Sequence, residues 1–278
     1  MAYTDILLTV RQEHASRYFQ NLSAQSDFRI KMVTSIADAR ALVADRDNHI
    51  DVLILDNGLE RVFEVVNDLR QTHARLLIIL VDEEADFAMP GQADDISTDP
   101  FTNDDLVHRI DRLMADRRLE TLRADTMPPL REFAKKLRKS VGEIGKQQAA
   151  VSACRELGYE YVAFYRLESL DPLQITLKAQ DGPAPIQAVA PKQGSEDDII
   201  GWVAKTGQSR IASPSDELHN YPLVRRGRLG AVACTPVGIT NRYGVILACR
   251  PEPNSITQQL LLMLELVSAQ LAAVASKD

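Results

Sequence analysis

Short aliphatic runs alternate with helix-forming segments through residues 1–120, and this alternation constrains the fold more than any other feature. The runs are DILLTV at 5–10, FRIKMV at 28–33, IDVLIL at 50–55 and LLIILV at 76–81, with a short fifth strand expected at 95–97. Between them, apolar residues recur at three- and four-residue spacing, as in amphipathic helices. Strands that alternate with helices over short connections predict a parallel sheet, whose ligands bind at the carboxyl ends of the strands.

Two stretches of this half resemble the receiver family of response regulators. IDVLILDNGL at 50–59 is similar to the third strand of a receiver and places Asp56 where that family carries its phospho-accepting aspartate. ADDISTDPF at 93–101 is similar to the receiver segment that ends in lysine, proline and phenylalanine. The resemblance covers residues 1–120 and implies an α/β fold with a flavodoxin-like parallel sheet.

The departures from the family bear directly on phosphorylation. Arg11 and Gln12 stand where receivers carry the acidic pair that binds magnesium, and Asp99 replaces the lysine. Phosphoryl transfer to a carboxylate needs cations beside the transferred group. An aspartate in place of the lysine repels that group instead, by about 4 kcal/mol at 4 Å and an effective dielectric of ~20.

Asp56 therefore has two interpretations. In the first it is a strand-terminal carboxylate of a pseudo-receiver, which acts as a docking or dimerisation platform. In the alternative it is the phospho-acceptor of a two-component response regulator, supplied by a histidine kinase or another regulator. The acidic segment 82–95, which contains Pro90 and Gly91, leaves little room for the helix expected there. We favour the pseudo-receiver.

Residues 121–145 are predicted to form a helical linker. A helix that begins near Asn103 continues through 112–123, and Pro128 with Pro129 starts a second one. The apolar face of the second helix is Leu130, Phe133, Leu137, Val141 and Ile144. This helix either packs on its own domain or forms a dimerising signalling helix, and the spacing fits both.

Residues 146–278 change to longer alternating strands. We expect strands at 159–167, 173–179, 230–236 and 244–249, a loop at 182–194, a short helix at 197–205 and a long helix at 256–276. GWVAKTGQSRIASP at 201–214, the strand pair 230–249 and the helix 255–275 resemble the GAF family. The resemblance implies an α+β domain in which an antiparallel sheet carries helices on one face and a pocket under the loops 182–222.

The ligand of such a pocket is not specified by these residues. The candidate pocket residues are Trp202, Ser213, Ser215, His219, Asn220 and Tyr221. The three cysteines, Cys154, Cys234 and Cys249, have no neighbouring histidine, so we expect buried thiols and no covalent bilin. No cofactor and no metal site are predicted, and an unidentified small ligand in the pocket remains open.

The last helix carries a heptad-like apolar seam. Its residues are Leu260, Leu264, Val267, Leu271 and Val274, with further apolar residues beside them. A helix that is apolar on more than one side is usually buried against its own sheet and against a partner. We predict a homodimer through this helix.

Charge and composition argue against some classes of function. The net charge of −7 argues against nucleic-acid binding, and the longest apolar runs are far shorter than the roughly 18 residues of a membrane span. No secretory signal is visible at the N-terminus, so we expect a cytoplasmic protein. With no catalytic motif, the sequence predicts a non-enzymatic signalling protein, although reduction of methionine sulfoxide by exposed thiols is a third hypothesis.

Overall fold

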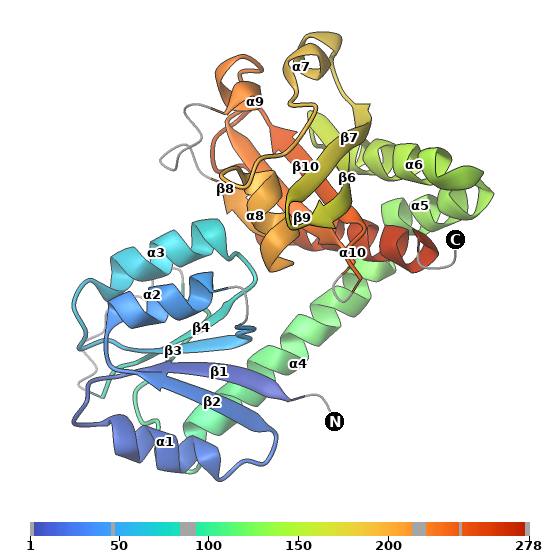
Figure 1. The fold of residues 1–278 in the computed structure, drawn as a ribbon. Coiled ribbons are helices and arrows are strands. Elements are labelled where there is room, and N and C mark those ends of the chain that lie inside the picture. Colours follow the sequence, from blue (N-terminus) through green and yellow to red (C-terminus); the bar gives the residue numbers. More distant parts are fainter. Residues whose placement is uncertain (1–2, 46–47, 84–92, 213–220, 239–240, 276–278) are drawn as a thin grey trace. The chain divides into compact units, whose positions relative to one another are not determined.

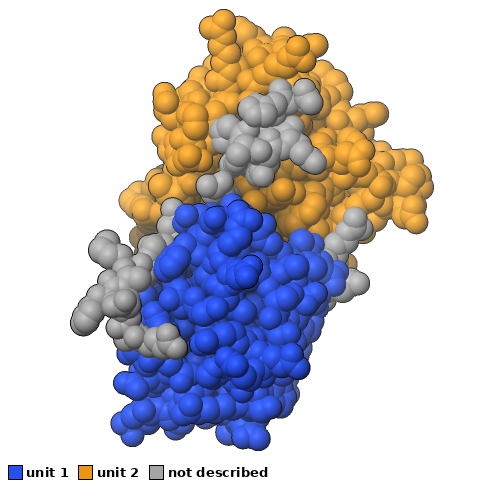
Figure 2. All heavy atoms as spheres, turned by 90° about the vertical axis from the view of Figure 1, so that its left-hand side faces the viewer, with its two compact units in different colours: residues 1–70, 75–120 blue, residues 71–74, 121–278 orange. Residues whose placement is uncertain are grey.

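The computed structural model describes residues 3–45, 48–83, 93–212, 221–238 and 241–275. The chain divides into two compact units, which are coloured separately in Figure 2. Unit 1 contains residues 1–70 and 75–120, and unit 2 contains residues 71–74 and 121–278.

Unit 1 has a five-stranded parallel sheet with helices on both faces (Figure 1). Its strands are β1 (Thr4–Thr9), β2 (Phe28–Val33), β3 (Val52–Asp56), β4 (Leu77–Val81) and β5 (Asp95–Ser97). Its helices are α1 (Ala15–Ser23), α2 (Ile36–Ala44) and most of α3 (Val62–Thr72) and α4 (Asp105–Asp125), whose last residues belong to unit 2. The strand order β2-β1-β3-β4-β5 is the flavodoxin-like order, so the predicted fold class of this half is confirmed.

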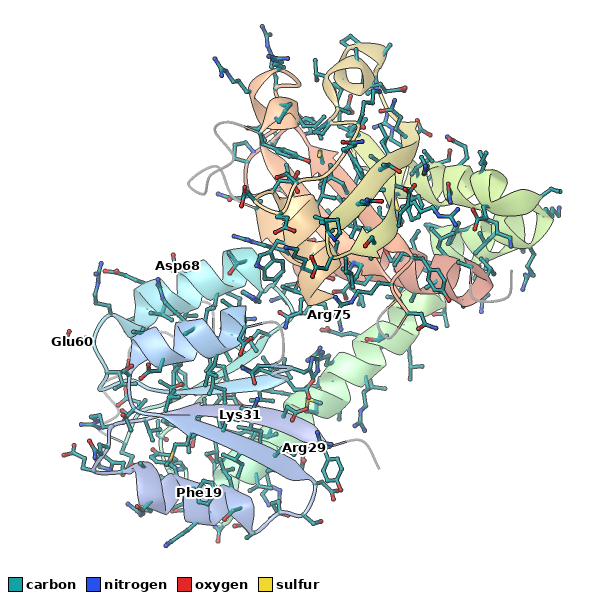
Figure 3. The ribbon with its side chains drawn as sticks, viewed as in Figure 1. Phe19, Arg29, Lys31, Glu60, Asp68 and Arg75 are labelled. Carbon is teal, nitrogen blue, oxygen red and sulfur yellow. The ribbon has the colours of Figure 1, made fainter. Side chains whose placement is uncertain are left out.

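The two faces of this sheet explain the sequence pattern. Helices α1 and α4 pack on one face and α2 and α3 on the other, so every residue of β3 is buried. A strand covered on both faces reads as a continuous apolar run, which is why β3 and β4 are recognisable in the sequence. The edge strand β2 alternates instead, and Figure 3 shows its Arg29 and Lys31. Charged side chains on an edge strand discourage pairing with another sheet.

Unit 2 has a five-stranded antiparallel sheet of order β7-β6-β10-β9-β8. Its strands are β6 (Tyr161–Leu170), β7 (Leu173–Asp181), β8 (Arg210–Ala212), β9 (Ala231–Val237) and β10 (Gly244–Arg250). Its helices are α5 (Pro128–Lys139), α6 (Gly142–Glu156), α7 (Ala184–Val189), α8 (Ile199–Thr206), α9 (Pro222–Arg225) and α10 (Gln258–Ala275). Helices α5, α6 and α10 cover one face, and α7, α8 and α9 cover the other. The predicted α+β class of this half is confirmed.

The linker differs from the prediction in one respect. Helix α4 ends at Asp125 and α5 begins at Pro128, as expected, but α5 ends at Lys139. Ser140 is extended and Gly142 has a φ of +71°, so the chain turns before α6 begins. Val141 and Ile144, which were expected on the buried face of one continuous helix, are 89% and 74% exposed. That part of the prediction is wrong.

The rest of the predicted linker helix packs on its own domain. Leu130, Phe133 and Leu137 of α5 are buried in the core of unit 2, beside α6 and α10. Three further elements of unit 2 were not predicted: α7 lies in the expected loop 182–194, and β8 and α9 are short. The segment 84–92, where little room for a helix was expected, lies outside the described residues.

The apolar seam of α10 faces inward. Leu264, Val267 and Leu271 are buried in the core of unit 2, and Leu260 and Val274 pack partly against it. The three buried seam residues are therefore not available as a dimer surface. Among the described helices, α10 is long and apolar enough to cross a membrane by length and composition, but a core helix passes the same test, and α10 packs on the sheet.

Candidate functional site

Asp56 is the last residue of β3, at the carboxyl edge of the sheet in unit 1. It is only 4% exposed, and donors surround both of its carboxylate oxygens. The Arg11 backbone N–H donates to Oδ2 at 3.2 Å, and Nε of the Arg11 side chain donates to the same oxygen at 2.9 Å. The Gly58 N–H donates to Oδ1 at 2.9 Å. Arg11 stands where receivers carry an acidic magnesium ligand, and here it places its own positive charge beside Asp56.

Gly58 makes room for this arrangement. A Cβ atom at position 58 would lie 2.5 Å from Cζ and 2.6 Å from Nε of Arg11. Real Cβ atoms do not approach other heavy atoms so closely, so the guanidinium lies directly over the turn that follows β3. The role of Gly58 was not predicted from the sequence.

These contacts set the ionisation of Asp56. Burial by itself would raise the pKa of this carboxyl group. The Arg11 side chain and the backbone N–H groups of Gly58 and Arg11 outweigh burial and hold the pKa of Asp56 below its usual value. Asp56 is therefore a paired carboxylate at neutral pH.

Further contacts of acidic side chains lie at the same edge of the sheet. Arg11 lies 3.7 Å from Glu13, and Glu13 lies 3.3 Å from His14. Glu83, just after β4, accepts a hydrogen bond from the Tyr18 hydroxyl at 3.0 Å and lies 3.7 Å from Arg17. Glu13 and Glu83 are thus already engaged by side chains of the same chain.

A magnesium ion does not fit this arrangement. Magnesium needs several oxygen ligands in octahedral geometry, and receivers supply them from an acidic pair. Here the Arg11 guanidinium lies against Asp56, and no group of three His, Cys, Asp or Glu side chains suited to a metal occurs in the part of the chain that the structure describes. Asp99, in place of the lysine, is exposed.

In unit 2 the predicted pocket residues are placed only in part. Trp202 lies partly buried on α8, with the Arg210 guanidinium 5.0 Å from its ring, and Tyr221 is 8% exposed. Ser213, Ser215, His219 and Asn220 lie outside the described residues. The structure therefore places two of the six candidates.

Buried side chains line the face of the sheet under α7, α8 and α9. The Tyr161 hydroxyl donates to Gln180 Oε1 and the Tyr165 hydroxyl to the Pro191 carbonyl, each at 2.8 Å. The Tyr221 hydroxyl is buried and has no hydrogen-bond partner among the residues that the structure describes. Burial, followed by the nearby Tyr165 and Asp198, raises the pKa of Tyr221 well above its ordinary value.

The glycines of the GWVAKTGQ stretch have definite roles. Asp198 caps α8 by accepting a hydrogen bond from the Gly201 N–H at 2.8 Å. A Cβ on Gly201 would lie 1.9 Å from the Ser195 carbonyl oxygen, and Gly207 ends the helix with a φ of +71°. Close approach and a left-handed cap both require glycine at these positions.

The three cysteines are buried, as predicted. Cys154, Cys234 and Cys249 are each 0% exposed. Burial raises the pKa of all three thiols, so they stay protonated at neutral pH. A protonated thiol without access to solvent is a poor nucleophile.

Comparisons with known proteins agree with the fold of unit 2. The GAF domain family matches residues 147–274, and no curated protein matches the chain. The GAF domain of a phosphoenolpyruvate-protein phosphotransferase from Acinetobacter is 17% identical, with a TM-score of 0.45, over 54% of this chain and 91% of that one. Its counterpart from Coxiella burnetii is 13% identical, with a TM-score of 0.46, over 57% and 94%.

The comparisons also include a response regulator. An orphan response regulator of H. pylori is 16% identical, with a TM-score of 0.34, over 39% of this chain and 94% of that one. For unit 1, the strand order and the helices on both faces carry the fold assignment. For unit 2, the family match coincides with α6 to α10 and the antiparallel sheet, and residues 147–274 of this chain are a GAF domain.

Proposed function

We propose that this chain is a non-enzymatic signalling protein in which a pseudo-receiver is coupled to a GAF sensor domain. A GAF domain together with a receiver-like fold supports a signalling role. The observation that carries the finer proposal is the pairing of Arg11 with Asp56, because it engages the carboxylate that a working receiver would phosphorylate.

The pairing opposes phosphorylation in two ways. Asp56 Oδ2 already accepts two hydrogen bonds from Arg11 and Oδ1 accepts one from Gly58, so attack on a phosphoryl donor would first require these contacts to break. The guanidinium is also held in place of a divalent cation, which would otherwise neutralise the transferred group. Opening the site would leave Asp56, which is 4% exposed, as a buried and unpaired anion.

Output then passes through protein contact. Residues 1–120 contain 23 Asp and Glu against 13 Lys and Arg, whereas residues 121–278 contain 16 against 19. A strongly acidic unit attracts partners with a basic surface and accelerates their association. The acidic pseudo-receiver is in this proposal the docking platform, and the GAF domain is the unit that senses.

Thiol catalysis is disfavoured by the burial of all three cysteines. Reduction of methionine sulfoxide by thiols needs an accessible thiolate, and Cys154, Cys234 and Cys249 are 0% exposed. A homodimer remains part of the proposal. Since Leu264, Val267 and Leu271 of α10 are buried in their own unit, the proposed dimer surface uses more exposed residues. Val141 and Ile144 are the most exposed large apolar side chains of unit 2 in the part that the structure describes.

Acetyl phosphate tests the central claim about Asp56. The full-length protein is incubated with acetyl phosphate and magnesium, and its intact mass is measured beside that of Asp56→Ala. We expect no stable addition to either protein. A phosphoryl group added to the wild type but not to Asp56→Ala would contradict this proposal. It would support the alternative, a response regulator that is phosphorylated on Asp56.

A further inference from the structure

Helix α4 carries an exposed apolar stripe. Leu119 is 47% exposed and Leu122 is 64% exposed, although leucine is among the residues most often buried. Ala115 is exposed as well, and steps of four and three residues place the three side chains on one side of the helix. Ile110 and Ala124 lie on the opposite side and are buried. The stripe is therefore the side of α4 that its own chain leaves uncovered.

Two charged residues of opposite sign flank the stripe along one edge. Asp116 follows Ala115, and Arg123 follows Leu122. They are seven positions apart, so their side chains project at nearly the same angle two turns apart. Both are exposed, and neither side chain has an ion-pair partner among the residues that the structure describes. This edge therefore has an unpaired negative charge at one end and an unpaired positive charge at the other.

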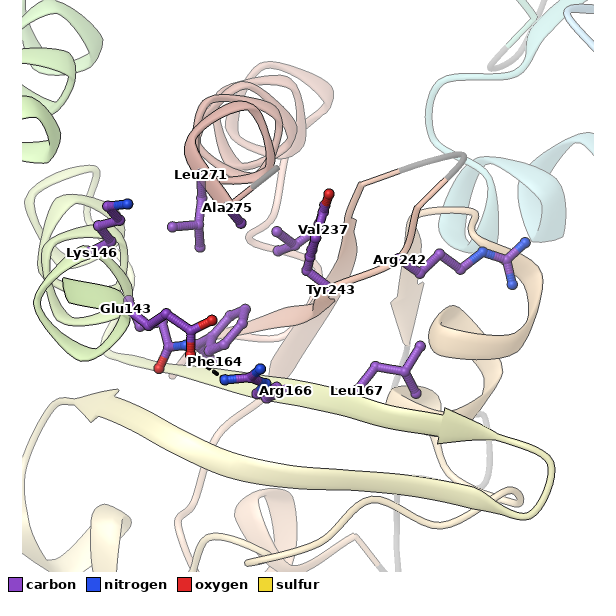
Figure 4. Close-up of a pocket in the computed structure, with 11 residues that line it drawn as sticks. Glu143, Lys146, Phe164, Arg166, Leu167, Val237, Arg242, Tyr243, Leu271 and Ala275 are labelled. Atoms are coloured by element: carbon purple, nitrogen blue, oxygen red, sulfur yellow. Dashed lines mark hydrogen bonds and ion pairs between the residues drawn. The ribbon is translucent and has the colours of Figure 1, made fainter. Parts of the chain in front are cut away.

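The cavity of unit 2 differs from this surface because its charges are paired. The cavity has a volume of about 100 Å³ and lies between α6, β6 and the end of α10. Figure 4 shows the ion pair between Glu143 and Arg166 in its lining. Since these two charges engage each other, they do not indicate a ligand, whereas the charges of α4 are available to a partner.

The order of charges on α4 favours one direction for a pair of such helices. In a parallel pair with the stripe at its core, the flanking positions would meet as like charges, Asp111 with Asp116 and Arg118 with Arg123 of the second copy. In an antiparallel pair, Asp116 lies beside Arg123 of the second copy, and the two-fold axis repeats this attractive contact. The stripe is thus complementary to itself in the antiparallel direction.

We propose that α4 pairs antiparallel with α4 of a second copy of this chain. Leu119 of each copy packs on Leu122 of the other, and Asp116 pairs with Arg123 at both ends. Asp116 and the exposed Glu120 beside the stripe disfavour an anionic lipid surface as the alternative occupant. The proposal rests on the homodimer proposed above and names its surface. It does not involve Asp56.

Analytical ultracentrifugation of the full-length protein tests the surface. We expect a dimer that Leu119→Glu weakens at least about tenfold while the variant keeps its thermal transition. Phe63→Glu on α3 is the matched control, since Phe63 is 42% exposed, and it should dimerise as the wild type does. A monomeric wild type would overturn this proposal together with the homodimer. A dimer that Leu119→Glu does not weaken would overturn this surface alone.

Charge reversal tests the direction of the pair. Asp116→Arg and Arg123→Asp each place two like charges together twice in the antiparallel pair, so each should weaken the dimer at least about threefold. The double variant restores opposite charges and should dimerise as the wild type does. In a parallel pair each single change would instead replace a repulsive contact by an attractive one. Tighter dimers of the single variants, or unchanged ones, would overturn the antiparallel arrangement.

Discussion

Nε of Arg11, just after β1, lies 2.9 Å from Oδ2 of Asp56 at the end of β3. The two residues are 45 positions apart, and the parallel pairing of β1 with β3 brings them to the same edge of the sheet. In this protein the carboxylate at that edge has a permanent cation from its own chain. A phosphorylation site needs a metal ion as its cation and an accessible carboxylate, so the proposed pseudo-receiver rests on this contact.

Arg11→Met should destabilise unit 1, because it leaves the nearly buried Asp56 carboxylate without its charged partner. We expect a loss of about 1–2 kcal/mol in the free energy of unfolding, reduced from the value for a fully buried pair since the Arg11 side chain is 34% exposed. Urea denaturation measures this change. Arg61→Met, which removes a surface pair with Glu64, is the control and should cost less than about 0.5 kcal/mol.

Gly58→Ala should have a similar effect without touching either charged residue. Its Cβ would meet the Arg11 guanidinium at 2.5 Å and displace it from Asp56. Gly145→Ala on α6 is the matched control, since its Cβ would meet no atom closer than 3.7 Å. Thermal unfolding should show Gly58→Ala destabilised and Gly145→Ala unchanged or stabilised by up to about 1 kcal/mol. The reverse order would show that Arg11 does not need the space over Gly58.

The Asp56 contact predicts a specific dependence on pH. The folded protein holds the pKa of Asp56 below its ordinary value of about 4, so the carboxylate stabilises the fold above that pH. This stabilisation is lost as the pH falls through the lowered pKa of the folded state. The difference in unfolding free energy between wild type and Asp56→Asn should therefore be largest near neutral pH and shrink in acid. A difference that is constant from neutral to acidic pH would contradict the assigned ionisation.

Leu264 and Ile144 should respond very differently to truncation. Leu264 is 0% exposed in the core of unit 2, so Leu264→Ala should cost about 2–5 kcal/mol. Ile144 is 74% exposed, and Ile144→Ser should change the stability by less than about 0.5 kcal/mol. Denaturant unfolding gives both values, and analytical ultracentrifugation of Ile144→Ser shows in addition whether this position contributes to a dimer. A large stability loss for Ile144→Ser alone would mean that a partner covers it.

The thiols should resist labelling in the native protein. Cys154, Cys234 and Cys249 are fully buried, and burial raises the pKa of each. Ellman's reagent should react slowly with the native protein and release three equivalents after denaturation in urea. Fast reaction of one thiol in the native state would reopen the possibility of thiol chemistry.

The sheets of both units could be predicted because the apolar patterns of their strands fit only one kind of structure. The continuous apolar runs at β3 and β4 fit only strands covered on both faces, and the first five residues of β6, Tyr161–Tyr165, are likewise all buried. The short helices α7 and α9 were missed because six and four residues are too few to show a helical period. The strand β8 was missed as well.

Helical spacing gave a wrong prediction for Val141 and Ile144, and at α10 it does not say which surface covers the apolar seam. Val141 continues the four-residue step from Leu137, but the turn at Ser140 and Gly142 interrupts the helix. The seam of α10 has the spacing of a coiled coil, yet Leu264, Val267 and Leu271 pack on their own unit. Periodicity shows that a face is apolar and not which surface covers it. For the same reason, Arg11 could be placed near the metal site from the sequence, but its contact with Asp56 could not.

Magnesium titration followed by amide NMR tests the central claim most directly. The amides of Arg11 and Gly58 both donate to Asp56, so they report any ion that enters the site. The proposed pairing predicts no saturable shift of either signal as magnesium is added, in the wild type or in Asp56→Ala. A saturable shift in the wild type that disappears in Asp56→Ala would show that the site still binds the metal, and the pseudo-receiver proposal would be wrong.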